Sequence, residues 1–282
     1  MQSDANPTFP LCCSPTAFQL LSAQVPQLHS TDALLNGAIA ITMHEIPAVQ
    51  PAAVDAEIQQ HADNVRARVR GRQSQALLAH LHEYLFDELG FRGNSEDYYN
   101  PANSYLPSVL QTRHGLPITL SLIYRLVAER VGLRAWGVGL PGHFLVGAEI
   151  DGAPILVDPF AGGRLLSREE ARDRLRHTFG EEVEWSEDLL KPASSRHWLT
   201  RILQNLLNVF GRQDRFRDVA AVLEMEMLLW PEQHHLQRDL GLVLARCGMT
   251  RPATIWLDRY LQENPGDPQN DQLRELLQVL GT

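Results

Sequence analysis

Residues 115–158 decide the fold, and they read GLPITLSLIYRLVAERVGLRAWGVGLPGHFLVGAEIDGAPILVD. The first part predicts a helix from about Pro117 to Val131, because proline is tolerated in the first turn and Gly132 supplies a C-terminal stop. Its broad apolar face is typical of a helix buried between other layers. Three short runs rich in β-forming residues follow, separated by Pro-Gly and Asp-Gly-Ala-Pro turns. They predict a three-stranded antiparallel meander over residues 135–140, 143–150 and 154–158.

This segment has the layout of a cysteine acyl-transfer site from which the nucleophile is missing. In such sites a thiol lies at a helix N-terminus, an imidazole lies beside it, and a carboxylate orients the imidazole. Here the predicted helix begins with Pro117, and His143 and Asp158 follow on the second and third strands. We therefore predict a remnant His143–Asp158 pair. Its alternative role is a purely structural hydrogen bond within the meander.

Two hydroxyls in the first turns of the helix are alternatives to a thiol. Thr119 is two positions after Pro117, which rotates it by roughly 200° away from the nucleophile position. Ser121 returns to nearly the same face, but about 6 Å further along the helix axis and toward the core. Neither hydroxyl is favoured as a nucleophile. No P-loop, GxGxxG or HExxH motif is present, and His143 and Asp158 have no identifiable further ligands, so neither metal nor cofactor is predicted.

Composition excludes several classes of function. The 282 residues carry a formal net charge of −9, which argues against a nucleic-acid partner because phosphate neutralisation needs clustered Lys and Arg. The three cysteines, Cys12, Cys13 and Cys247, form no CxxC pair, which favours a cytoplasmic protein. No run of 18 or more apolar residues occurs, so no membrane partner is expected.

The flanking regions read as helical. An apolar stripe predicts a helix from Ser74 to Leu89, with Gly90 as its stop. From Ser194 onward the chain is helical again and shows an internal repeat, since Pro231 and Pro265 are separated by 34 residues, the period of the tetratricopeptide unit. About two repeats are too few for a free solenoid, so this tail is expected to pack on the domain before it.

Several motifs together resemble the bacterial Sir-B family. They are YYNPANSYL at 98–106, GLPITLSL at 115–122, GVGLPGHFLV at 137–146, and Asp158-Pro159-Phe160 followed by Gly162-Gly163. That family combines a transglutaminase-like domain with a tetratricopeptide tail. The resemblance therefore implies an α+β fold with a helical N-terminal region, a papain-like core of a central helix against a small antiparallel sheet, and an α-helical tail.

The resemblance also implies domain limits and site residues. We expect residues 1–30 to be a poorly ordered leader, residues 31–190 to form the transglutaminase-like domain, and residues 191–282 to form the helical tail. In related enzymes a Cys begins the central helix, and Pro117 occupies that position here. Asn103, Arg113 and Thr119 are further candidates for ligand binding. The structural alternative for Asn103 is an Asx turn with the loop backbone. The structural alternative for Arg113 is an ion pair with a nearby acid.

Three hypotheses of function remain open from the sequence. The leading one is a non-catalytic, cytoplasmic module that binds a peptide or protein in the cleft beside His143 and Asp158. The second is a peptidase or amidase-like hydrolase that uses these two residues without a cysteine. The third is a structural adaptor that acts through the tail. Fold similarity alone does not choose among them, because function resides in the site.

Overall fold

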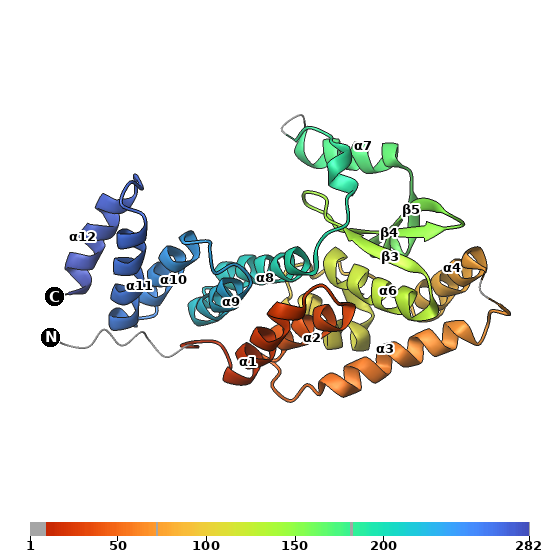
Figure 1. Ribbon diagram of the computed structural model, residues 1–282, viewed down its shortest axis with the longest axis horizontal. Helices are drawn as coiled ribbons and strands as arrows, with labels where there is room; N and C mark the ends of the chain where they lie inside the picture. Colours follow the sequence, from red (N-terminus) through yellow and green to blue (C-terminus); the bar gives the residue numbers. More distant parts are fainter. Residues whose placement is uncertain (1–9, 72, 181–182, 282) are drawn as a thin grey trace.

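The computed structural model describes residues 10–71, 73–180 and 183–281. Helices dominate both ends of the chain, and a four-stranded sheet and a short two-stranded one lie between them, so the predicted α+β class is confirmed (Figure 1). The N-terminal region contains α1 (Pro15–Gln24), η1 (Val25–Gln27), α2 (Thr31–Thr42), α3 (Pro51–Arg66), α4 (Ser74–His82), η2 (Glu83–Glu88), β1 (Arg92–Gly93), η3 (Pro101–Ser104), α5 (Leu106–Thr112) and β2 (His114–Gly115).

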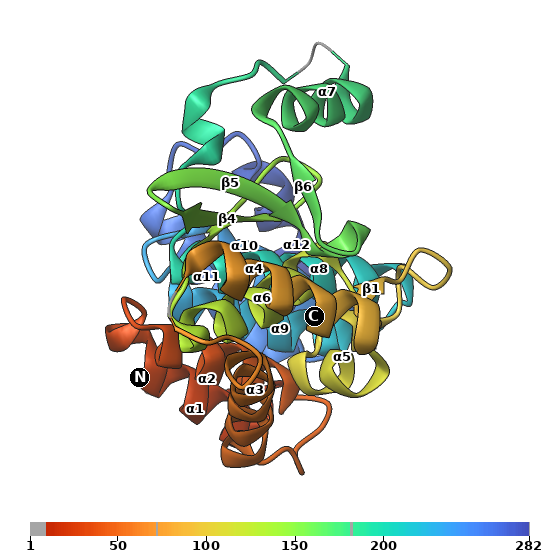
Figure 2. The same ribbon diagram turned by 90° about the vertical axis from the view of Figure 1, so that its right-hand side faces the viewer.

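The core is a buried helix against an antiparallel sheet. Helix α6 (Pro117–Val131) has the predicted limits, with Pro117 in its first turn and Gly132 at its C-terminal end with a φ of 96°. The sheet has the order β3-β4-β5-β6, which makes it a meander. Its strands are β3 (Arg134–Val138), β4 (Leu145–Ile150), β5 (Ala153–Asp158) and β6 (Arg164–Leu166). Figure 2 shows α6 on one side of this sheet and α7 (Arg168–Phe179) beyond the other.

Two details of the core differ from the prediction. His143 does not lie on a strand, because Gly142 adopts a φ of 66° and the His143 amide closes a turn by donating to the Leu140 carbonyl at 3.1 Å. A fourth strand, β6, pairs with β5 although it has only three residues. The helix expected from Ser74 to Leu89 is also divided, since α4 passes into the π-helical turn η2 at Glu83.

The helical tail begins beside the core. It contains η5 (Glu187–Leu190), α8 (Ser195–Arg212), α9 (Phe216–Leu229), α10 (His235–Arg246), α11 (Thr250–Glu263) and α12 (Asn270–Leu280). In Figure 1, α8 runs between the core and the outer tail helices. Leu199 of α8 packs on Gly37 of α2 so closely that a Cβ at position 37 would lie 2.6 Å from Leu199 Cδ1.

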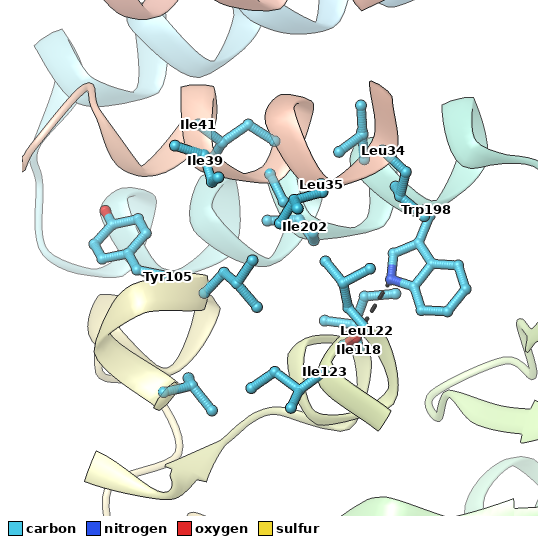
Figure 3. Packing of buried hydrophobic residues seen from close by; sticks show 14 of the residues in the cluster. Leu34, Leu35, Ile39, Ile41, Tyr105, Ile118, Leu122, Ile123, Trp198 and Ile202 are labelled. Atoms are coloured by element: carbon cyan, nitrogen blue, oxygen red, sulfur yellow. Dashed lines mark hydrogen bonds between the residues drawn. The ribbon is translucent and has the colours of Figure 1, made fainter. Parts of the chain in front are cut away.

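Helices α2, α6 and α8 share one hydrophobic core (Figure 3). Trp198 of α8 is fully buried, and its indole nitrogen donates to the Ile118 carbonyl of α6 at 3.3 Å. The ring packs on Phe144 with a centroid distance of 4.6 Å. Burying a large aromatic side chain in this way stabilises the folded state by about 1.5–3 kcal/mol on transfer scales. The first helix of the tail is therefore held rigidly against the central helix.

The prediction of a poorly ordered leader through residue 30 is wrong for residues 10–30. Helix α1 packs into the core, with Ala17 and Leu21 fully buried. Just before it, the amides of residues 11–13 donate to the carboxylate of Glu224 in α9. Apolar side chains and one buried acid thus fix this segment, in spite of its prolines. The first nine residues of the expected leader lie outside the described residues.

Candidate functional site

Asp158 anchors a polar cluster at the end of β5. Its carboxylate is fully buried, and Oδ1 accepts the amides of Phe160 at 3.1 Å and Ala161 at 3.2 Å at the start of η4 (Pro159–Ala161). The other oxygen, Oδ2, lies 3.1 Å from Nε2 of His143. An Asp that ends a strand and caps the next turn has its orientation fixed by the backbone. The fold therefore brings the two predicted residues together.

Arg174 is a third member of this cluster, and no sequence motif pointed to it. It comes from α7, and its side chain is about one-third exposed. Its Nη1 atom donates to Asp158 Oδ2 and also lies 2.7 Å from His143 Nε2. One arginine nitrogen thus lies between the imidazole and the carboxylate.

Two contacts of Nε2 bear on which ring nitrogen of His143 carries the proton. A guanidinium can only donate, so the Arg174 contact favours an Nε2 that accepts, whereas the Asp158 contact favours an Nε2 that donates. A protonated Nε2 would instead place two donors 2.7 Å apart. The contact with Arg174 is the shorter of the two, and we infer from it that a neutral ring holds its hydrogen on Nδ1. In a catalytic pair of this kind the carboxylate would instead hold the hydrogen of one nitrogen, and the other nitrogen would act as base.

The electrostatics of Asp158 follow from its neighbours. Burial alone would raise the pKa of this carboxyl, but the adjacent His143 and Arg174 side chains outweigh it and lower the pKa. Asp158 is therefore ionised at neutral pH. Its ion-pair partner on α7 is the guanidinium of Arg174.

A cleft opens beside His143. Its volume is about 370 Å³, and it lies between the N-terminus of α6, the loop before β4 and one face of α8. The residues that line it are Tyr98, Tyr99, Leu116, Pro117, Ile118, Gly142, His143, Phe144, Arg201, Gln204, Asn205, Asn208 and Val209. Pro117 and His143 thus face the same space, as a nucleophile and its base would. Helix α8 forms one wall of this cleft.

Neither of the alternative hydroxyls reaches the cleft. Thr119 and Ser121 are fully buried, and Ser121 Oγ donates to the Phe144 carbonyl at 3.3 Å. Cys12 and Cys13 lie beside Glu224, and burial raises the pKa of their thiols to about 11 and about 12. Raised values of this kind describe inert thiols. None of the described residues that line the cleft is a Cys, Ser or Thr.

The remaining predicted site residues lie outside the lining of the cleft. Asn103 donates to the carbonyls of Asp97 at 2.7 Å and Tyr98 at 3.2 Å, so it supports the loop that carries two lining tyrosines. Arg113 lies 3.7 Å from Glu57 and stacks on Phe91, in keeping with its structural alternative. Thr119 is enclosed in the core, and its Oγ1 has no hydrogen-bond partner within the described chain.

Residues missed by the sequence reasoning come mainly from helices. Arg174 and Arg201 are arginines in amphipathic helices, where arginine is an ordinary surface residue and gives no distinct signal. Within the described ranges, no group of three or more His, Cys, Asp or Glu side chains is arranged to hold a metal ion. The described helices include none that is both long and apolar enough to cross a membrane.

Comparison with known proteins agrees with this architecture. A family model described as the transglutaminase-like superfamily matches residues 52–204, and one described as the tetratricopeptide repeat matches residues 206–278. Tetratricopeptide repeats generally mediate contacts between proteins. The first match ends within α8, so that it includes Arg201 and Gln204 of the helix that walls the cleft. No solved structure matches the chain.

Curated relatives include bacterial and mammalian proteins. A UPF0162 protein of Xylella fastidiosa (strain 9a5c) is 37% identical over 245 residues, which are 86% of this chain and 87% of the relative. A UPF0162 protein of Pasteurella multocida (strain Pm70) is 27% identical over 210 residues, or 73% and 79% of the two chains. F-box only protein 21 of Mus musculus is 32% identical over 175 residues, which are 58% of this chain but 27% of the mouse protein. The name Sir-B stays a prediction. The chain belongs to the transglutaminase-like superfamily, carries a tetratricopeptide tail, and is a relative of the bacterial UPF0162 proteins.

Proposed function

We propose that this protein is a non-catalytic member of its superfamily that binds a peptide or protein segment in the cleft beside His143. One observation carries this proposal. The position at the N-terminus of α6 that would hold the nucleophile is Pro117, and it lines the cleft together with His143. A proline side chain has no group that can attack an acyl carbon. The cleft thus has an imidazole and a helix N-terminus in its lining, but no thiol or aliphatic hydroxyl that could attack.

The state of His143 supports a binding role as well. With Nε2 accepting from Arg174, the Nδ1–H of the ring is available as a donor rather than as a base. Such a donor suits a carbonyl or carboxylate oxygen of a ligand. We propose the cytoplasm as the location, since the three cysteines are free thiols.

A hydrolase is the second candidate, because the His143–Asp158 contact of 3.1 Å is retained. It would need His143 to activate a water molecule, and therefore an unprotonated nitrogen directed at the cleft. A third candidate is an adaptor that works through the tail. An apolar groove of about 550 Å³ between α10 and α12, lined by Leu242, Leu276 and Leu280 among others, favours that candidate.

The test is to incubate the full-length protein with a mixed library of acetylated hexapeptides and to analyse bound and free peptides by mass spectrometry. We expect the wild type to retain a subset of peptides at their original masses, and His143→Gln to lose most of that subset. A matched variant in the tail groove, Leu276→Ser, should retain the subset unchanged. Shortened or deamidated peptides that require His143 would contradict the proposal in favour of the hydrolase. If Leu276→Ser loses the bound peptides and His143→Gln keeps them, the adaptor is favoured.

A further inference from the structure

Helix α8 presents a polar stripe to the cleft. Arg201, Gln204, Asn205 and Asn208 all line it, and their spacing of i, i+3, i+4 and i+7 places them on one helix face. The opposite face of the same helix is apolar and contains the buried Leu199, Leu203 and Phe210. The apolar face explains how α8 is attached to the core. It does not explain why the other face carries amides and a guanidinium.

Arg201 is a cation without a counterion. Its Nη2 donates to the Leu140 carbonyl over a long 3.4 Å, and no Asp or Glu of the described residues forms an ion pair with it. The side chain is partly buried, and burial lowers the pKa of its guanidinium, partly offset by Tyr98. None of the described residues lining the cleft is acidic. Desolvating a cation without a partner is unfavourable, so an anionic ligand would restore a lost interaction.

The neighbouring groups complete a site for an extended chain. Arg212 stacks on the ring of Tyr99 at 4.3 Å, and its Nε donates to Asn208 Oδ1 at 2.7 Å. That bond uses the amide oxygen of Asn208 and leaves its NH₂ group as a donor. Amide side chains can pair with the donors and acceptors of a peptide backbone, and tyrosine rings supply rigid contact area.

We propose that the ligand of the cleft carries a carboxylate, and that Arg201 binds this carboxylate while the amides of α8 contact the adjoining peptide backbone. This inference rests on the proposed binding function and specifies its ligand. The fork of a guanidinium matches the two oxygens of a carboxylate. A single arginine neutralises one negative charge. A phosphate group carries nearly two, and the net charge of the chain is −9, so a carboxylate suits the site better.

The test uses three matched sets of acetylated hexapeptides and fluorescence anisotropy with the full-length protein. One set has a free C-terminus and no Asp or Glu, the second has an amidated C-terminus with Asp or Glu at varied positions, and the third is amidated and neutral. We expect binding to the first or the second set, which identifies a terminal or a side-chain carboxylate, and about ten- to hundredfold weaker binding to the neutral set.

Substitution separates the two proposals. Arg201→Gln should weaken the binding of whichever carboxylate-bearing set the wild type binds by about ten- to hundredfold. It should also remove the preference for that set over the neutral peptides. Arg196→Gln is the matched control, because Arg196 lies on the same helix but stacks on Trp230 outside the cleft. Binding that is equal for all three sets and unchanged in Arg201→Gln overturns the carboxylate inference and leaves the binding function standing. If an additional amidated set with phosphoserine in place of Asp or Glu binds more tightly, the carboxylate inference is also overturned. Absence of binding to every set, with both variants folded, overturns the binding function itself.

Discussion

Asp158 in the core and Glu224 in the tail are both buried carboxylates that accept backbone amides, but their surroundings differ in charge. Asp158 accepts two amides and also contacts Arg174. Glu224 accepts the amides of Leu11 at 2.7 Å, Cys12 at 3.1 Å and Cys13 at 2.8 Å, and it forms no ion pair with a basic side chain of the described residues. Burial raises the pKa of Glu224, and its hydrogen bonds offset this only in part, whereas the pKa of Asp158 is lowered.

The difference shows what each acid does. Three neutral donors fasten the segment before α1 to α9, which is a structural role and needs no fixed charge. His143 and Arg174 beside Asp158 keep that carboxylate ionised, and Arg174 also contacts the adjacent imidazole. A buried acid with a cation and a cleft beside it therefore belongs to a site. A buried acid with amides alone belongs to the scaffold.

The largest effect should come from removing the carboxylate of the site. Asp158→Ala leaves two backbone amides without an acceptor and Arg174 without its buried counterion, so the free energy of unfolding should fall by about 3–5 kcal/mol. Urea denaturation monitored by circular dichroism measures this loss. If the alanine variant does not fold, Asp158→Asn keeps one acceptor oxygen and should cost about 1–3 kcal/mol.

Glu149 offers the control for this experiment. Its pair with Arg134 lies on the surface, where the two side chains are 40% and 77% exposed. Glu149→Ala should therefore change the free energy of unfolding by less than about 1 kcal/mol. Equal losses for Asp158→Ala and Glu149→Ala would contradict the view that burial and the attached amides make the Asp158 cluster stable.

The central helix and the sheet were predictable because their signals are local. Proline in the first turn, a glycine stop and runs of β-forming residues between turn sequences fixed α6 and three strands to within a few residues. The order of His143 and Asp158 on consecutive segments also brought those two residues together in the prediction. His143 was misplaced by a short distance, because the turn at Gly142 ends the pairing before β4 begins.

The rest depends on contacts between segments far apart in the chain. Arg174 reaches Asp158 only because α7 folds back over the sheet, and no spacing in the sequence reports that. Arg201 faces the cleft only because Trp198, one helical turn earlier, is buried against α6. The segment at residues 11–13 has its partner in α9, more than two hundred residues away. Long-range partners of this kind carry no periodic signal.

An intermediate effect should appear in the pH dependence of stability, with opposite signs for the two acids. The lowered pKa of Asp158 means that its contribution is present above about pH 3.9, the ordinary value in the unfolded chain, and is lost as pH falls through the folded pKa. The raised pKa of Glu224 means that its contribution is complete below about pH 4.3 and is lost as pH rises through the folded pKa.

Urea titrations between about pH 3.5 and pH 7 test these signs. The stability advantage of the wild type over Asp158→Asn should shrink toward the acid end, and its advantage over Glu224→Gln should shrink toward neutral pH. Hydrogen exchange at the amides of residues 11–13 should quicken in Glu224→Gln and stay unchanged in Asp158→Asn. If the difference in unfolding free energy between the wild type and each variant changes with pH in the same direction, Arg174 does not distinguish the two acids.

The smallest effect on stability, but the sharpest on the site, should come from Arg174→Met. Arg174 is about one-third exposed, but its partner Asp158 is fully buried; since His143 can replace it as a donor to Asp158, its loss should cost about 1–2 kcal/mol, less than the loss of Asp158. Without its N–H, Nε2 of His143 is free to take the ring proton and donate to Asp158, which lies 3.1 Å away. Long-range proton–nitrogen correlation spectra distinguish the two tautomers, and the His143→Gln spectrum assigns the signals.

In the wild type we expect the hydrogen on Nδ1, and in Arg174→Met on Nε2. His61 is the internal control, since burial and then Arg113 lower its pKa to about 4 and its Nδ1 contacts the Tyr84 hydroxyl, remote from α7. The variant would then have the tautomer of a general base, with a lone pair on Nδ1. If the wild type already shows the hydrogen on Nε2, the prediction is wrong. Arg174 then does not set the tautomer of His143, and the cation beside Asp158 has no effect on the imidazole.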